Sequence, residues 1–211
     1  MSYVDEFKTV DLILNSDSRT RTVDAFALSL IKAERQTRKL FTYLVYQFPA
    51  FGPADRIELR RILAASTSVY FDGVIRGLDQ LSPVSMSDLV GIEYAHLSDR
   101  FRVFGRYRNK IFHGQITEYG LGAAQLSQNI VDIRLWCQTL AGNALRELGY
   151  DGFGRNSFRK SDTTPNLSER LKSRINSLAE YEVFIRDHME RPRQRRCTDV
   201  APTGTLMASE N

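Results

Sequence analysis

Apolar residues recur every three or four positions along most of this 211-residue chain, and this spacing constrains the fold more than any other feature. It is the periodicity of α-helices that bury one face. Alternation with a period of two, which marks a half-buried strand, is hard to find in the sequence. The pattern therefore predicts an all-helical fold. Helices are expected over residues 18–48, 53–81, 87–113, 123–148 and 165–191.

Prolines and glycines mark the limits of the expected helices. Pro49 and Pro53 interrupt the pattern after the first helix, and Gly149 follows the fourth. Proline is favoured in the first turn of a helix and glycine just after the last turn, so both residue types agree with these limits. Gly91 and Gly105 are weak points inside the third helix, each costing up to about 1 kcal/mol. The residues before 16 are expected to be a polar lead-in.

Four long helices with short connections are typical of an antiparallel four-helix bundle, which we expect over residues 1–148. A glycine-rich polar linker over 149–164 then leads to an additional C-terminal helix over 165–191. That helix is expected to cover one end of the bundle or to form an oligomer interface. Residues 192–211 are polar and rich in arginine at their start, which predicts a flexible tail.

Charge, hydropathy and cysteine content exclude several classes of protein. The chain has 29 Lys and Arg against 25 Asp and Glu, a net charge of +4 that is too small for a histone-like polycation. No apolar run approaches the roughly 20 residues that span a bilayer. The N-terminal sequence MSYVDEFKTV has acids where a signal peptide needs basic and then apolar residues. Cys137 and Cys197 form neither a disulfide framework nor a zinc site on their own. We therefore expect a cytoplasmic protein with no membrane partner.

The positive charge is concentrated near the end of the third expected helix. Five cations fall within eleven residues and precede His113: Arg100, Arg102, Arg106, Arg108 and Lys110. On a helix, residues three or four positions apart share a face. One polar face is therefore predicted to carry Arg102, Arg106, Asn109 and His113.

Arg108 falls on a different, apolar face of the same expected helix. Four side chains define that face: Phe101, Phe104, Ile111 and Phe112. A charge placed there needs a partner, because an isolated buried charge is very costly. Glu34 lies within the apolar stripe of the first expected helix, and it is the candidate partner of Arg108 inside the bundle.

Residue types and spacing alone leave several interpretations open. A basic helix face is usually solvated, and a histidine near a helix end is often a capping residue. An arginine in an apolar stripe can also extend its charged group to water. At this level the chain is a helical bundle with a basic face that contains a histidine.

A family resemblance rests on the last residues of the third expected helix. The segment RNKIFH, from Arg108 to His113, resembles the signature of the HEPN superfamily. That signature is an Arg, then a polar residue such as Asn, Asp or His, then a spacer and a His. Asn109 takes the polar position. HEPN domains are all-α bundles whose motif lies towards the end of a late core helix, and the resemblance covers roughly residues 18–148.

The resemblance implies an endoribonuclease that cleaves RNA without a metal ion or another cofactor. It implies catalytic roles for Arg108 and His113, with Asn109 in support. Imidazole suits proton transfer near neutral pH, and the planar guanidinium suits phosphate oxygens. Contacts to the RNA are expected from three further cations: Arg102, Arg106 and Lys110.

A homodimer is a further expectation, because HEPN ribonucleases usually combine the Arg and His of two protomers in one composite site. Arg108 and His113 are about 140° apart around a regular helix, so one copy does not bring them together. A second copy is expected to complete the site.

The resemblance also implies a toxin or an antiphage defence effector. Some HEPN toxins carry a Tyr two residues after the His, which a partner nucleotidyltransferase modifies with AMP. Gln115 occupies that position here, which argues against this subfamily. The size and organisation of the chain better match an abortive-infection type of antiphage effector. An antitoxin or a regulatory protein is then an expected partner.

Two alternatives belong to other functional classes. One is a non-catalytic helical module that binds RNA or a protein, with His113 as a capping residue. The other is a regulatory or antitoxin-like subunit whose basic face docks an acidic protein.

Overall fold

The computed structural model describes residues 2–113, 122–154 and 156–191. Every regular element within these ranges is a helix, so the expected all-helical class is confirmed. The first half contains α1 (Tyr3–Leu14), α2 (Arg21–Tyr46), a 3-10 turn (Pro53–Asp55), α3 (Arg56–Ala65) and α4 (Phe71–Leu81). The second half contains α5 (Met86–Val90), a 3-10 turn (Gly91–Glu93), α6 (Tyr94–Phe112), α7 (Ala123–Leu148), α8 (Leu167–Arg170) and α9 (Leu178–His188). None of these helices combines the length and the apolar character needed to cross a bilayer.

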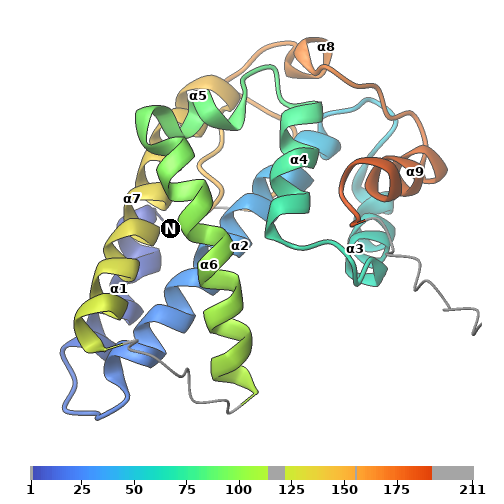
Figure 1. Ribbon diagram of the computed structural model, residues 1–211. Helices are drawn as coiled ribbons and strands as arrows, with labels where there is room; N and C mark the ends of the chain where they lie inside the picture. The colour runs from blue at the N-terminus through green and yellow to red at the C-terminus, as the bar shows by residue number, and fades with distance from the viewer. Residues whose placement is uncertain (1, 114–121, 155, 192–211) are drawn as a thin grey trace, which may run out of the picture.

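The central element of the fold is α2. Figure 1 shows α2 passing diagonally behind α6 and α4, with α1 and α7 towards one side and α3 and α9 towards the other. Its 26 residues give it a length of about 39 Å at 1.5 Å per residue. It packs against α1, α4, α6 and α7. Different faces of α2 therefore pack against different helices.

An aromatic cluster holds α6 against its neighbours. The ring of Phe101 stacks on Phe71 at the start of α4, with centroids 4.6 Å apart, and lies 4.9 Å from the ring of Trp136 on α7. Phe104 meets Phe26 of α2 edge to face at 5.8 Å. Burial of such large aromatic side chains is strongly stabilising, so these contacts fix the rotation of α6 about its own axis.

The N-terminal helix α1 was expected to be a polar lead-in, and that prediction is wrong. Ser2 and Asp5 form a capping box, in which each side chain accepts a hydrogen bond from the backbone N–H of the other residue. Phe7 and Val10 lie three residues apart and are buried. The polar composition of this segment concealed a short amphipathic helix.

The helices expected over 53–81 and 87–113 are each interrupted. Ser66 ends α3, and its hydroxyl donates to the carbonyl of Ile62 at 3.3 Å. Serine and threonine side chains compete in this way with helical hydrogen bonds. The second interruption lies at Gly91, whose φ of +81° is a conformation that glycine adopts without steric cost. The continuous helices that we expected are therefore pairs of shorter ones.

The continuous helix expected over 165–191 is also wrong. Residues 171–177 are not helical and separate α8 from α9. The backbone N–H of Lys172 donates to the last carbonyl of α4 at 3.0 Å, which ties this segment to the end of α4. The side chain of Ser177 caps α9 by accepting from the N–H of Glu180 at 3.1 Å. Helix α9 packs on α3 and α4, at one end of the molecule.

The segment 149–164 was expected to be a linker, but its described residues pack onto α2. Tyr150, Phe153 and Phe158 are buried within it. The ammonium of Lys160 donates to the carbonyl of Tyr46 at 2.7 Å and to other carbonyls at the C-terminal end of α2, and burial lowers the pKa of Lys160. The described residues of this segment belong to the core although none of them is helical.

Two expectations lie outside the described residues. They concern Gln115 and the tail over 192–211.

Candidate nucleic-acid interface

A groove with a volume of about 600 Å³ is lined by α4, α6 and part of α2. We call it the α4–α6 groove. Three carboxylates line it: Glu34, Asp72 and Asp79. Six arginines line it: Arg38, Arg76, Arg102, Arg106, Arg108 and Arg191. The groove therefore has an excess of positive charge, which favours an anionic ligand.

Two residues hold the guanidinium of Arg108 in this groove. Its Nη1 donates to both carboxylate oxygens of Glu34 on α2, at 2.5 Å each. Its Nε and Nη2 donate to Oδ1 of the adjacent Asn109, at 3.4 and 3.2 Å. The side chains of Arg108 and Glu34 are 22% and 23% exposed, so water only partly screens the pair. Since a guanidinium has five N–H donors, these contacts leave one on Nη2 for a ligand.

Glu34 was the candidate partner of Arg108, and the structure contains this ion pair. Arg108 lies on the apolar side of α6 as expected, close to the buried Phe104. The carboxylate arrives from α2 because that helix packs directly against α6. Charge neutralisation makes this otherwise costly position tolerable.

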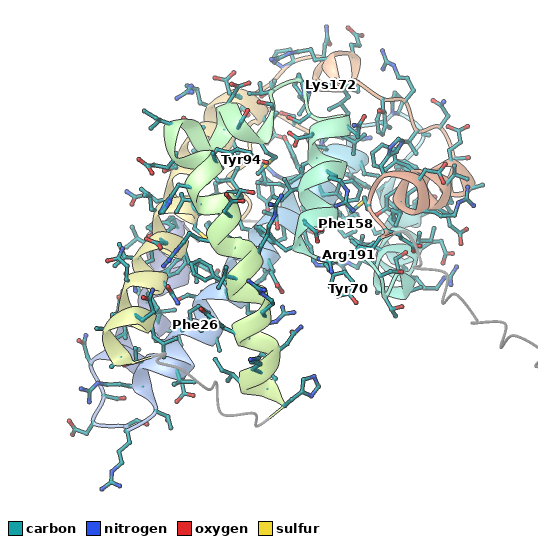
Figure 2. All side chains as sticks on the ribbon, in the orientation of Figure 1. Phe26, Tyr70, Tyr94, Phe158, Lys172 and Arg191 are labelled. Atoms are coloured by element: carbon teal, nitrogen blue, oxygen red, sulfur yellow. The ribbon has the colours of Figure 1, made fainter. Side chains whose placement is uncertain are left out.

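Two arginines meet at Asp72 on the rim of the groove. Its carboxylate accepts from Arg76 and from Arg191, at 3.1 Å in each case. Burial raises the pKa of Asp72, but the hydrogen bonds and charges of Arg191 and Arg76 outweigh it, and the pKa is lowered. The guanidinium of Arg191 also lies 4.5 Å from the centroid of the Tyr70 ring, and Figure 2 labels these two residues next to each other. Tyr70 is 45% exposed, so it offers an aromatic surface of the kind on which a base stacks.

Three other arginines keep charge available for a ligand. Arg38 and Arg106 form no ion pair within the ranges that the structure describes, and Arg38 donates to the carbonyl of Val69 at 2.8 Å. Arg102 pairs with Asp99 at 3.1 Å, but both side chains are about three-quarters exposed. An ion pair so exposed contributes little, and it does not prevent Arg102 from contacting an anion.

The structure brings together only some of the residues that the sequence analysis singled out. The groove is lined by Glu34 and by four residues of α6: Arg102, Arg106, Arg108 and Asn109. Lys110 and His113 do not line it. Lys110 is exposed on the last turn of α6, and His113 is exposed directly after that helix, where its backbone N–H donates to the carbonyl of Asn109 at 3.0 Å.

One chain therefore does not bring Arg108 and His113 into the same groove, in keeping with their angular separation on a regular helix. Phe112, next to His113, is 62% exposed, although it was expected on the apolar face of the helix. The end of α6 thus presents a large apolar side chain and an imidazole to the surface.

The sequence analysis missed the residues that other elements bring to the groove. These are Arg38, Tyr70, Asp72, Arg76 and Arg191. One signal was present, because Asp72 and Arg76 lie four residues apart in an expected helix, the spacing of a helical ion pair. Nothing in the local sequence links Arg191 to them, since its position depends on how α9 docks.

No group of three or more His, Cys, Asp or Glu side chains in the described part of the chain is arranged to hold a metal ion. Comparison of the chain with protein-family models, with curated proteins and with solved structures finds no match. The fold and the groove define the class: an all-helical protein with an arginine-rich surface groove.

Proposed function

We propose that this chain is a HEPN-type endoribonuclease that cleaves RNA without a metal ion, at a site composed by two copies. The observation that carries this proposal is the position of Arg108. Glu34 and Asn109 hold its guanidinium in a groove lined by further arginines. The same helix ends in the exposed His113. In this proposal α2, α4, α6 and α7 are the four helices of the expected bundle, since α2 packs against each of the other three and α6 packs on α7.

The chemistry follows from these residue types. The 2′-hydroxyl attacks the adjacent phosphorus, the bond to the 5′ oxygen breaks, and a cyclic phosphate and a 5′-hydroxyl result. A base must accept the proton of the 2′-hydroxyl, and an acid must protonate the leaving oxygen. His113 transfers these protons, because an imidazole nitrogen can both accept and donate a proton. Arg108 stabilises the charge that develops on the phosphate oxygens. The need for a 2′-hydroxyl restricts the reaction to RNA.

A second copy supplies the histidine that the groove of one chain lacks. The exposed Phe112 lies beside His113 and provides apolar contact for such an association. In this proposal the protein is a cytoplasmic toxin or antiphage defence effector. An antitoxin or a regulatory protein is its natural partner.

RNA cleavage by the purified chain tests the proposal. With EDTA present, we expect the wild-type chain to cleave RNA. Arg108→Ala and His113→Ala are each expected to lower the rate by about 10²- to 10⁴-fold, the usual range for a lost catalytic group. His96→Ala is the matched control, because His96 is also an exposed histidine and lies near the opposite end of α6. Equal rates for the wild type and all three variants would contradict the proposal.

A second candidate function is a non-catalytic module that binds RNA or a protein. The observation in its favour is that His113 does not line the groove. RNA binding with a steep salt dependence, but without cleavage, is the result that this alternative predicts. Co-purification with an acidic protein and without RNA would instead indicate a regulatory or antitoxin-like subunit.

A further inference from the structure

A second cleft, with a volume of about 650 Å³, lies where α2, α3 and residues 156–158 meet. We call it the α2–α3 cleft. One carboxylate and four cations line it: Glu34, Arg35, Arg38, Lys39 and Arg60. Because Glu34 is already paired with Arg108, it does not neutralise these cations. The cleft is therefore a second region of concentrated positive charge.

Three of the cations form one stripe along α2. Arg35, Arg38 and Lys39 are three and four positions apart, so they share a face of the helix. Arg35 pairs with Glu6 at 3.1 Å, but Arg38 and Lys39 form no ion pair with any described residue. The ammonium of Lys39 donates to the carbonyl of Phe153 at 2.7 Å. Burial and, to a smaller extent, the nearby charge of Arg35 lower the pKa of Lys39.

Arg60 of α3 lines the same cleft in a fixed orientation. Its guanidinium lies 4.7 Å from the centroid of the Phe158 ring, which is buried. A guanidinium held over an aromatic ring keeps the N–H groups at its edge free for hydrogen bonds to phosphate oxygens. Arg60 is exposed and forms no ion pair within the described ranges. It is therefore ready to bind an anion.

The cleft adjoins the α4–α6 groove. Glu34 and Arg38 line both cavities, so the two share a border on α2. A small anion needs only one such cavity. Two adjoining cavities of this size, each with excess positive charge, suit an extended polyanion that passes from one to the other over Arg38.

We propose that the α2–α3 cleft binds the phosphate backbone of the RNA that flanks the cleavage position. A strand seated in the α4–α6 groove then continues past Arg38 to Arg60. The identity of the polymer rests on the proposed function, whereas the cleft itself rests on the positions of its cations. Because contacts to phosphates do not depend on the bases, the cleft adds affinity for longer RNA without adding sequence preference.

The test uses two labelled single-stranded RNAs, of about 4 and about 16 nucleotides, the range of site sizes of single-strand-binding domains. The cleft variant is Arg35→Gln combined with Arg60→Gln. Binding is measured by fluorescence anisotropy at several salt concentrations, and cleavage is followed in parallel. The matched control is Arg19→Gln with Arg146→Gln, because both arginines are exposed and neither lines the groove or the cleft. Urea unfolding of each variant verifies that it folds.

We expect the cleft variant to bind the short RNA like the wild type. Its affinity for the longer RNA should fall by about tenfold or more at low salt, with the salt slope smaller by about 0.7 for each lost phosphate contact. The control should match the wild type for both RNAs.

Equal affinity of the cleft variant and the wild type for the longer RNA would overturn this inference. An acidic protein surface would then be the remaining ligand for the cleft. If the wild type cleaves RNA in that case, the proposed function stands and only the cleft proposal fails. If the cleft variant loses affinity for the longer RNA while the wild type cleaves neither, the cleft proposal stands and the ribonuclease proposal fails. A wild-type chain that binds neither RNA overturns the cleft proposal as well.

Discussion

Glu34 and Arg108 lie 74 residues apart in the chain and form the ion pair that fixes the central guanidinium of the α4–α6 groove. The pair joins α2 to α6 as well as positioning a donor for phosphate. Its two roles can be separated, because stability is measured without RNA. The pair is partly buried, so it should contribute more than an ion pair in open water and less than a fully buried one.

Breaking this pair should destabilise the fold. Glu34→Gln is expected to lower the free energy of unfolding by about 1–2 kcal/mol, since Arg108 then lacks a carboxylate in a partly dry position. Combining it with Arg108→Gln should cost less than the sum of the single changes, because the two residues are in contact. Urea unfolding followed by circular dichroism measures both effects. Asp99→Asn is the control, since its ion pair on the same helix is largely exposed. Additive effects of Glu34→Gln and Arg108→Gln would contradict the coupling.

Single residues also show how much of the candidate site could be predicted. The sequence placed Arg108 on an apolar face and singled out Glu34, because the cost of burying a lone charge holds in any fold. Arg102, Arg106 and Asn109 follow from helical spacing alone. The arginines of the other elements do not, because their approach to α6 depends on tertiary packing. The signals they left were local helical spacings: that of Asp72 and Arg76 on α4, and that of Arg35 and Arg38 on α2.

At the level of elements, the longest and most periodic helices were the most predictable. The limits of α7 agree with the helix expected over 123–148, because its apolar stripe is regular and Gly149 ends it with a φ of +80°. The region around α3 and α4 was not predictable to the same degree. Hydroxyl side chains near Ser66 compete with the backbone N–H groups for helical carbonyls. The apolar periodicity continues through these residues, so the sequence pattern does not reveal the break between α3 and α4. The break before α9 arises from hydrogen bonds to α4, which no local pattern reveals.

Two glycines of the helices give opposite predictions for substitution by alanine. A Cβ at Gly73 of α4 would collide with the carbonyl oxygen of Met189, just after α9. Because that oxygen belongs to the backbone, α9 would have to move, and Gly73→Ala should cost about 1–3 kcal/mol, the usual cost of overpacking. A Cβ at Gly142 of α7 meets no atom within 4 Å. Gly142→Ala should therefore stabilise the chain by up to about 1 kcal/mol through helix propensity.

Urea unfolding compares the two variants under the same conditions. Equal changes in the unfolding midpoint would contradict close packing of α9 on α4. A shift of α9 in Gly73→Ala would also affect Arg191, which lies two residues after Met189 and pairs with Asp72 on α4.

At the scale of the whole molecule, the net charge of +4 says little, whereas its distribution says more. Carboxylates neutralise several cations in the described part of the chain, but the α4–α6 groove and the α2–α3 cleft retain positive charge. The expected linker implied that the core ends with α7. Instead, the described part of 149–164 packs on α2 and extends the core beyond that helix. Composition alone could not reveal this, because the segment combines glycines with aromatic residues that become buried.

The exposed end of α6 provides a test of assembly. We expect the wild-type chain to be a dimer at micromolar concentration and Phe112→Asp to raise the dissociation constant by about 30-fold or more, as for a central interface residue. Ile92→Asp is the control, because Ile92 is 98% exposed and lies before the start of α6. Light scattering during size-exclusion chromatography measures both variants. A monomeric wild-type chain, or equal effects of the two changes, would contradict an interface at this end of α6.

Glu34 and Asn109 fix Arg108 within a single chain, and this has a consequence for the kinetics. The guanidinium is already ordered before a second copy binds, so dimerisation does not include the entropic cost of ordering it. RNA affinity should then be the same for a dilute monomer as for the assembled protein. Under the composite site proposed above, cleavage instead requires two copies, and at protein concentrations below the dimer dissociation constant its initial rate should rise with the square of the concentration.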